Sequence, residues 1–278
     1  MTSSRFRPHH ALGLAAALAF ALFPIFWMVS TSLKPFGEWA AVPPPWVPRD
    51  LTLGNYAPLY MRYEESYVTA PRTGLGAILD SCIIAGGTTA LALVIGLMAA
   101  IGFSRYRAGS DRLAIGILAV RAVPPITLAI PALFLFTSFG LRDTHIGIIF
   151  VHTAFGVPFA FWMLKSFIDE VPPAIEEAGM MDGMSRLRAH LVVTVPMIRG
   201  GLAVTGLFIF ILTWNEFLLT VTLSDKLIVT VPIYLHHHTG VYGVQAALAV
   251  AAALPIVFFG FMIQKHLARA FTLGAIKQ

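Results

Sequence analysis

The sequence has few charged residues. Asp, Glu, Lys and Arg together make up 12% of its 278 residues, whereas an average soluble domain has about 25%. Hydrophobic residues make up 57%, and the mean hydropathy is +0.78. This composition leaves too little polar surface to enclose a water-soluble globule, and it also excludes an intrinsically disordered chain. The solvent that fits is a lipid bilayer, so we expect an integral membrane protein.

Cysteine and nucleotide-binding motifs are also scarce. Cys82 is the only cysteine, which excludes an intramolecular disulfide. No Gly-Lys pair occurs anywhere, so the sequence lacks the phosphate-binding loop G-x-x-x-x-G-K-[S/T]. No nucleophile–base pair with a site around it is recognisable either. We therefore predict no catalytic residues, and we expect that this chain does not itself hydrolyse ATP.

The apolar residues fall into six runs, and about 20 such residues are needed to cross a bilayer as a helix. The predicted spans are residues 11–33, 81–104, 113–139, 144–166, 192–223 and 243–264. The first run is too long for a signal peptide and lacks a convincing cleavage site, which favours a retained anchor. The sequence thus predicts an all-α polytopic fold, with residues 1–278 forming a single transmembrane domain.

The basic residues predict the orientation of the spans. With the N-terminus in the cytoplasm, twelve Lys and Arg residues lie inside, six lie outside, and Arg121 lies within the membrane. Because cytoplasmic loops are enriched in Lys and Arg, both termini are expected in the cytoplasm. The +5 net charge then reflects topology, and no nucleic-acid partner is expected.

Residues 34–77 become an external loop in this topology. The loop contains Pro43-Pro44-Pro45, which favours extended backbone, and it is rich in aromatic side chains: Trp46, Tyr56, Tyr60, Tyr63 and Tyr67. Two interpretations stay open. The aromatic side chains either lie in the lipid headgroups or form a docking surface for an external partner.

The cytoplasmic loop at residues 169–191 carries its own structural signals. Pro172-Pro173 favours the start of a helix, and Glu176 then lies near the positive end of its dipole. Asp182-Gly183 predicts a turn, and Ser185 is suited to cap a second helix. The pattern predicts a helix–turn–helix elbow, whose apolar side chains either contact another protein or float in the headgroup layer.

This loop resembles the EAA loop of ABC importer permeases. The resemblance rests on Glu176-Glu177-Ala178-Gly179-Met180-Met181-Asp182-Gly183 and on Val195-Pro196. The family pattern is E-A-A, then D-G-A, then L-P; Gly179, Met184 and Val195 depart from it. Further motifs resemble the smaller, maltose-type permease of the carbohydrate branch: Thr52-Leu53, Asn55-Tyr56, Arg121 with Pro124-Pro125, Ile130-Pro131, Phe139-Gly140-Leu141, Thr144, Pro158-Phe159 and Trp214-Asn215-Glu216-Phe217.

The resemblance implies a type I importer permease of the bacterial inner membrane, forming half of a pore for a sugar or polyol. It implies three partners: a second permease, a cytoplasmic ATPase dimer that binds ATP and Mg, and an external solute-binding protein. This chain itself would bind no cofactor. The resemblance assigns ATPase coupling to Glu176, Glu177, Ala178, Gly179, Asp182, Gly183 and Pro196.

Charged residues within the membrane mark candidate functional positions because their burial is costly. We expect Arg121, Trp214, Asn215 and Glu216 to line the translocation path, with a structural role as the alternative. The different depths of Arg121 and Glu216 argue against a meeting of the two.

The histidines leave a rival interpretation, a membrane-embedded metal enzyme. We expect His145 and His152 to be buried and hydrogen-bonded, and the adjacent His236, His237 and His238 to point in different directions, so no metal site is predicted. A second rival is a secondary transporter acting alone, which would need internal repeats that the sequence does not show.

Overall fold

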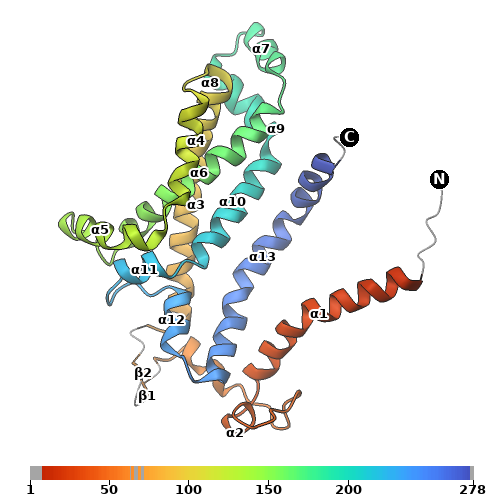
Figure 1. The fold of residues 1–278 in the computed structure, drawn as a ribbon, viewed down its shortest axis with the longest axis vertical. Helices are drawn as coiled ribbons and strands as arrows, with labels where there is room; N and C mark the ends of the chain where they lie inside the picture. Colours follow the sequence, from red (N-terminus) through yellow and green to blue (C-terminus); the bar gives the residue numbers. More distant parts are fainter. Residues whose placement is uncertain (1–7, 63, 66–67, 70–71, 276–278) are drawn as a thin grey trace. The chain divides into compact units, whose positions relative to one another are not determined.

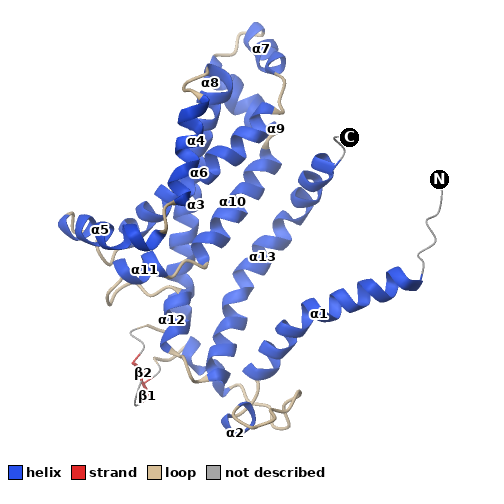
Figure 2. Cartoon of the chain, viewed as in Figure 1, coloured by secondary structure: helices blue, strands red, loops and turns tan. Residues whose placement is uncertain are grey.

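The computed structural model describes residues 8–62, 64–65, 68–69 and 72–275, so Tyr63 and Tyr67 lie outside the described residues. Nearly all of its regular structure is helical (Figure 2). The exception is a short antiparallel hairpin of β1 (Glu64–Glu65) and β2 (Val68–Thr69). The predicted all-α fold class is confirmed.

Within the described residues, four helices are long and apolar enough to cross a membrane unaided. They are α1 (Pro8–Ser32), α3 (Gly74–Tyr106), α6 (His145–Asp169) and α13 (Tyr242–Ala275). Two further candidate spans consist of helix pairs that meet at a sharp bend, which brings the possible number of spans to six.

The first bent pair replaces the single helix expected at residues 113–139. α4 (Asp111–Ala119) and the 3₁₀ turn η2 (Val120–Ala122) meet α5 (Pro125–Ser138) at 88°. Val123 and Pro124 both adopt extended backbone, with ψ of 120° and 129°. The cause is local, because a residue that precedes a proline is driven out of the helical region.

The second bent pair replaces a continuous helix at residues 192–223. A segment of α8 (Arg186–Ala189), the π-helical turn η3 (His190–Thr194) and α9 (Val195–Met197) meets α10 (Arg199–Trp214) at 75°. Pro196 has no N–H to donate to the preceding turn, which favours a break here. The chain leaves the helix again after Trp214, and α11 (Leu218–Leu223) follows as a separate short helix.

The chain divides into two compact units. The larger unit comprises residues 76–233 and 255–278. In Figure 1, its helices α3, α4, α6 and α10 run side by side, with α7 (Pro173–Met181) and α8 at one end. Glycine allows α3 and α6 to approach closely: a Cβ built on Gly96 would lie 2.4 Å from the Cβ of Ala160. Such small-residue contacts are typical of helices packed within a membrane.

The smaller unit comprises residues 1–75 and 234–254. Beyond α1 it contains α2 (Phe36–Trp39), the 3₁₀ turn η1 (Gly54–Leu59) and most of α12 (Val231–His237). Polar contacts fix the position of the loop that follows α1. The Asn55 side chain donates to the carbonyls of Ser32 and Lys34, and the hydroxyls of Ser32 and Tyr56 lie 2.8 Å apart.

Candidate functional site

The elbow at residues 169–191 forms as its sequence predicts. α7 begins at Pro173, and Gly183 follows it with a positive φ of 88°. Ser185 then caps α8, since its hydroxyl accepts a hydrogen bond from the backbone N–H of Arg188. Positive φ is the conformation that glycine adopts without strain, which explains a glycine at this junction.

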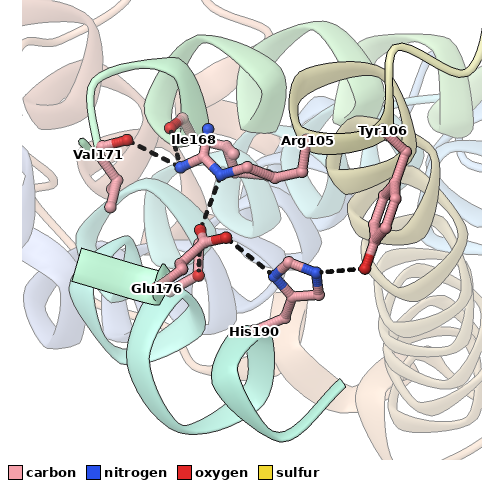
Figure 3. A network of polar contacts seen from close by, with 7 residues as sticks. Arg105, Tyr106, Ile168, Val171, Glu176 and His190 are labelled. Atoms are coloured by element: carbon pink, nitrogen blue, oxygen red, sulfur yellow. Dashed lines mark hydrogen bonds and ion pairs between the residues drawn. The ribbon is translucent and has the colours of Figure 1, made fainter. Parts of the chain in front are cut away.

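A buried ion pair holds the elbow onto the membrane helices (Figure 3). Arg105, at the end of α3, donates from Nε to Oε1 of Glu176 on α7 at 2.8 Å. Its Nη2 donates to the carbonyls of Ile168 and Val171, at 3.0 and 2.8 Å. The side chains of Arg105 and Glu176 are only 8% and 5% exposed. The fork of one guanidinium therefore joins α3, α7 and the end of α6.

The other side of the Glu176 carboxylate faces the π-helical turn η3. The Thr194 hydroxyl donates to Oε1 at 2.6 Å, and Nδ1 of His190 lies 3.3 Å from Oε2. Nε2 of His190 lies 2.9 Å from the Tyr106 hydroxyl, which extends the network back to α3 (Figure 3). Burial alone would raise the pKa of Glu176. Hydrogen bonds from Thr194 and Arg105 and the charge of Arg105 instead hold that pKa below its ordinary value.

The structure divides the residues predicted for ATPase coupling. Those with exposed positions on the elbow are Glu177, Ala178, Asp182 and Gly183. Glu176 and Gly179 are buried, so they support the elbow from inside and do not form its surface. Pro196 is exposed but lies in α9, at the bend rather than on the elbow.

The exposed face of the elbow is also apolar. Met181 is 88% exposed and Leu187 is 68% exposed, while Ile175 is 39% exposed. The supporting residues Arg105, His190 and Thr194 could not be recognised in the sequence. Arg105 counted there only as a positive charge on the cytoplasmic side, because no sequence pattern pairs it with a residue 71 positions away.

A second candidate site is a cavity of about 250 Å³ in the larger unit, where a few polar side chains lie among mainly apolar ones. Arg121 and Glu216 both line it, so their different positions along the predicted spans do not keep them from sharing one cavity. The reason lies in the helix breaks: the chain bends after Ala122 and leaves α10 at Trp214, and both side chains lie at these interruptions. The Arg121 guanidinium packs 5.1 Å from the ring centroid of Phe159.

Glu216 has a structural role beside this cavity. Its two carboxylate oxygens accept from the backbone N–H groups of Leu219 and Thr220, at 2.9 and 3.1 Å, in the first turn of α11. The Thr220 hydroxyl also contacts it and lies 3.0 Å from Nε2 of the buried His152. Glu216 is therefore a helix cap and a cavity-lining residue at once.

The other two residues predicted for the path lie elsewhere. Trp214 is buried at 3% exposure and stacks on Phe210, with ring centroids 5.6 Å apart. The exposed Asn215 donates its amide to the carbonyl of Ile211. Neither residue lines the cavity that Arg121 and Glu216 share.

His145, His152 and His238 form hydrogen bonds with protein groups. Nε2 of His145 lies 2.8 Å from a carboxylate oxygen of Asp80, and His152 contacts Thr220 as described. His236 is exposed, while His238 is buried with Nδ1 2.9 Å from the Tyr234 carbonyl. Among the described residues, no three His, Cys, Asp or Glu side chains are grouped as metal ligands.

Comparison with known proteins identifies the family. Residues 92–273 match the family described as binding-protein-dependent transport system inner membrane component. The chain belongs to this family. It is therefore a permease component of the inner membrane, which makes it a transport subunit rather than an enzyme.

Two curated relatives of this permease component span nearly its whole length. It is 31% identical to the trehalose transport system permease protein SugB of Mycobacterium tuberculosis, over 94% of each chain. It is 29% identical to the trehalose/maltose transport system permease protein MalG of Thermococcus litoralis, over 96% of this chain and 95% of the relative.

Solved structures share its fold. One is the crystal structure of a bacterial ABC transporter involved in the import of the acidic polysaccharide alginate. It superposes with a TM-score of 0.71 at 19% identity and covers 95% of this chain and 99% of that one. The inward-facing MetNI methionine ABC transporter gives a TM-score of 0.57 at 16% identity, over 70% of this chain and 94% of that one. The type I importer permease fold is confirmed.

Proposed function

We propose that this permease component forms half of a pore that imports a sugar or polyol by alternating access. A second permease subunit completes the pore, a cytoplasmic ATPase dimer binds ATP and Mg and powers it, and an external binding protein delivers the solute. Both termini face the cytoplasm in this arrangement. The sugar assignment is supported by relatives whose names specify trehalose and maltose.

The structure of the elbow is the main support for this proposal. Its surface offers exposed apolar side chains together with Glu177 and Asp182, and a buried ion pair fixes it to the membrane helices. A surface helix that only floats in the headgroup layer has no need of such a buried anchor. An adaptable apolar surface on a rigid support suits a contact that transmits force from another protein.

Reconstitution of the full complex in proteoliposomes tests the proposal. Radiolabelled trehalose and maltose are offered with the binding protein, with and without ATP on the ATPase side. We expect uptake of at least one of them to require ATP, the ATPase and this chain together. Uptake that proceeds without the ATPase would instead support a secondary transporter, and ATP-driven uptake of neither sugar would overturn the sugar assignment.

A further inference from the structure

Helix α3 differs from the other three long helices in its lack of proline. α1, α6 and α13 contain Pro24, Pro158 and Pro255, whereas α3 runs uninterrupted over 33 residues. An internal proline removes a backbone hydrogen bond and bends a helix. With 1.5 Å of rise per residue, the stretch from Asp80 to Arg105 is one continuous helical element about 37 Å long.

The Arg105 end of α3 holds the elbow. The guanidinium of Arg105 binds Glu176, and the neighbouring Tyr106 contacts His190. Because the ion pair is buried, removal of one partner leaves an uncompensated charge, so the two side chains resist separation. The elbow and this end of α3 therefore move together.

The Asp80 end of α3 holds a different segment. Asp80 Oδ2 accepts from the backbone N–H of Val229 at 3.1 Å, and the Ser81 hydroxyl accepts from the N–H of Val231 at 2.8 Å. Residues 224–230 have no regular structure, so side-chain contacts of this kind position them. No pattern in the sequence predicts this attachment.

A second attachment of residues 224–230 comes from the start of helix α6. Asp143, just before α6, accepts from the backbone N–H groups of Lys226, Leu227 and Ile228 at 2.8 to 3.0 Å. α6 packs closely along α3: besides the contact at Gly96, a Cβ on Gly87 would lie 2.6 Å from Ile149. The two helices thus form one tightly packed body, and each end of that body carries an attached segment.

We propose that α3, with α6 packed along it, transmits movement of the elbow to residues 226–231 at its far end. Arg105 and Asp80 are the positioning residues at the two ends. This inference rests on the proposed function, because it assigns the path by which ATPase movement reaches the opposite side of the membrane. It assigns no solute contact to either residue.

A double-mutant cycle across the membrane tests the transmission. Glu176→Gln removes the charge at one end, Asp80→Asn removes it at the other, and a third variant combines both. The readout is ATP hydrolysed per solute taken up in proteoliposomes, normalised to assembled complex. Lys165→Gln and Asp111→Asn are the controls: the first breaks an exposed ion pair within α6, with Asp169 at 2.6 Å, and the second removes an exposed charge in the first turn of α4.

We expect each single variant to raise the hydrolysis-to-uptake ratio at least about fivefold, the lower range of typical coupling between sites. In the double variant, the hydrolysis-to-uptake ratio should be no higher than in the more strongly affected single variant, because one break already interrupts the path. Both controls should keep the unmodified ratio. Effects that multiply, as they do for distant independent sites, would overturn the proposal, as would an unchanged ratio in either single variant.

Cys82 provides a second readout that does not depend on uptake. It is the only cysteine of the chain, lies two residues from Asp80, and is half-buried. Its rate of modification by a maleimide should change when the complex binds ATP. That change should be lost in Glu176→Gln and kept in Lys165→Gln. If Glu176→Gln does not assemble, Arg105→Lys takes its place, because it keeps the charge but loses the fork to Ile168 and Val171.

The outcomes separate the two proposals. An unmodified complex that shows no ATP-driven uptake overturns the proposed function. An unmodified complex with normal uptake, combined with an ATP-dependent Cys82 response that survives Glu176→Gln, overturns only the transmission through α3.

Discussion

At the scale of single residues, Gly183 shows how one backbone angle shapes a surface. Its φ is +88°, and a Cβ added there would meet no atom within 4 Å. The chain itself therefore leaves room for a side chain, and only the backbone conformation requires glycine. A substitution at Gly183 consequently acts through backbone strain or through a partner that covers the elbow.

We expect Gly183→Val to cost about 1–3 kcal/mol of local backbone strain, because a β-branched residue resists this φ. Retention of the ATPase on purified complex should fall, and so should uptake, both normalised to permease abundance. Gly183→Asn is the matched control, since asparagine tolerates positive φ. Equal retention and uptake in Gly183→Val and the unmodified complex would show that the elbow is not the coupling contact.

Glu216 combines two roles that substitution can separate. Glu216→Ala removes the cap of α11, a loss that typically costs about 0.5–2 kcal/mol, and membrane abundance should fall together with transport. Glu216→Gln keeps an acceptor oxygen and removes only the charge. We expect it to retain abundance and lose transport, as measured by immunoblot and by uptake. Unchanged transport in Glu216→Gln would leave this residue a structural role alone.

The lowered pKa of Glu176 predicts that the stability of the fold depends on pH. Its folded pKa is lowered from an ordinary 4.5, so its ionised form stabilises the fold fully above about that pH. The contribution is lost as the pH falls through the lowered pKa. The melting temperature of the purified subunit should therefore exceed that of Glu176→Gln most at neutral pH, and the difference should shrink on acidification below about pH 4.5. A difference that grows with acidification would contradict the assignment.

At the scale of helices, close approach and interruption decide the architecture. Gly96 lets α3 lie against α6, where a Cβ would come within 2.4 Å of Ala160 and 3.0 Å of the backbone nitrogen of Phe161. The breaks before α5 and after α10 have the opposite effect, since they expose polar side chains to the cavity that Arg121 and Glu216 share. Backbone freed by such breaks is tolerated in membranes only where it is buried in protein or lines a wet cavity.

Gly96→Ala should force α3 and α6 apart and destabilise the subunit by about 1–3 kcal/mol, measured as a lower melting temperature and lower abundance. Gly86→Ala is the control in the same helix, because a Cβ there meets nothing within 4 Å. We expect this control to match the unmodified protein. A similar loss in both variants would mean that general alanine effects, not packing at Gly96, are responsible.

At the scale of the whole molecule, the distribution of basic residues predicts both termini in the cytoplasm. Reporter fusions at Gln278 and within residues 34–77 should report opposite sides of the membrane. Fusions at two positions within 34–77 control for local disruption. Matching signals from the terminus and the loop would reverse or rearrange the topology and would place the elbow away from the ATPase.

The sequence alone determined what depends on composition and neighbouring residues. Charge-poor runs predicted membrane helices, and Pro172-Pro173, Asp182-Gly183 and Ser185 predicted the elbow, because helix starts, turns and caps are set within a few residues. The bend before Pro125 followed the same local rule, although hydropathy alone suggested one continuous span.

Only the tertiary structure decided which distant polar groups meet. Arg105 and Glu176 are 71 residues apart, and Asp80 and Val229 are 149 residues apart, so no local periodicity pairs them. The structure also turned Glu176 inward and left Glu177 on the surface, and it brought Arg121 and Glu216 to one cavity. The physical reason is that burial makes an unpaired charge costly, and its partner comes from whichever helix the packed fold places within reach.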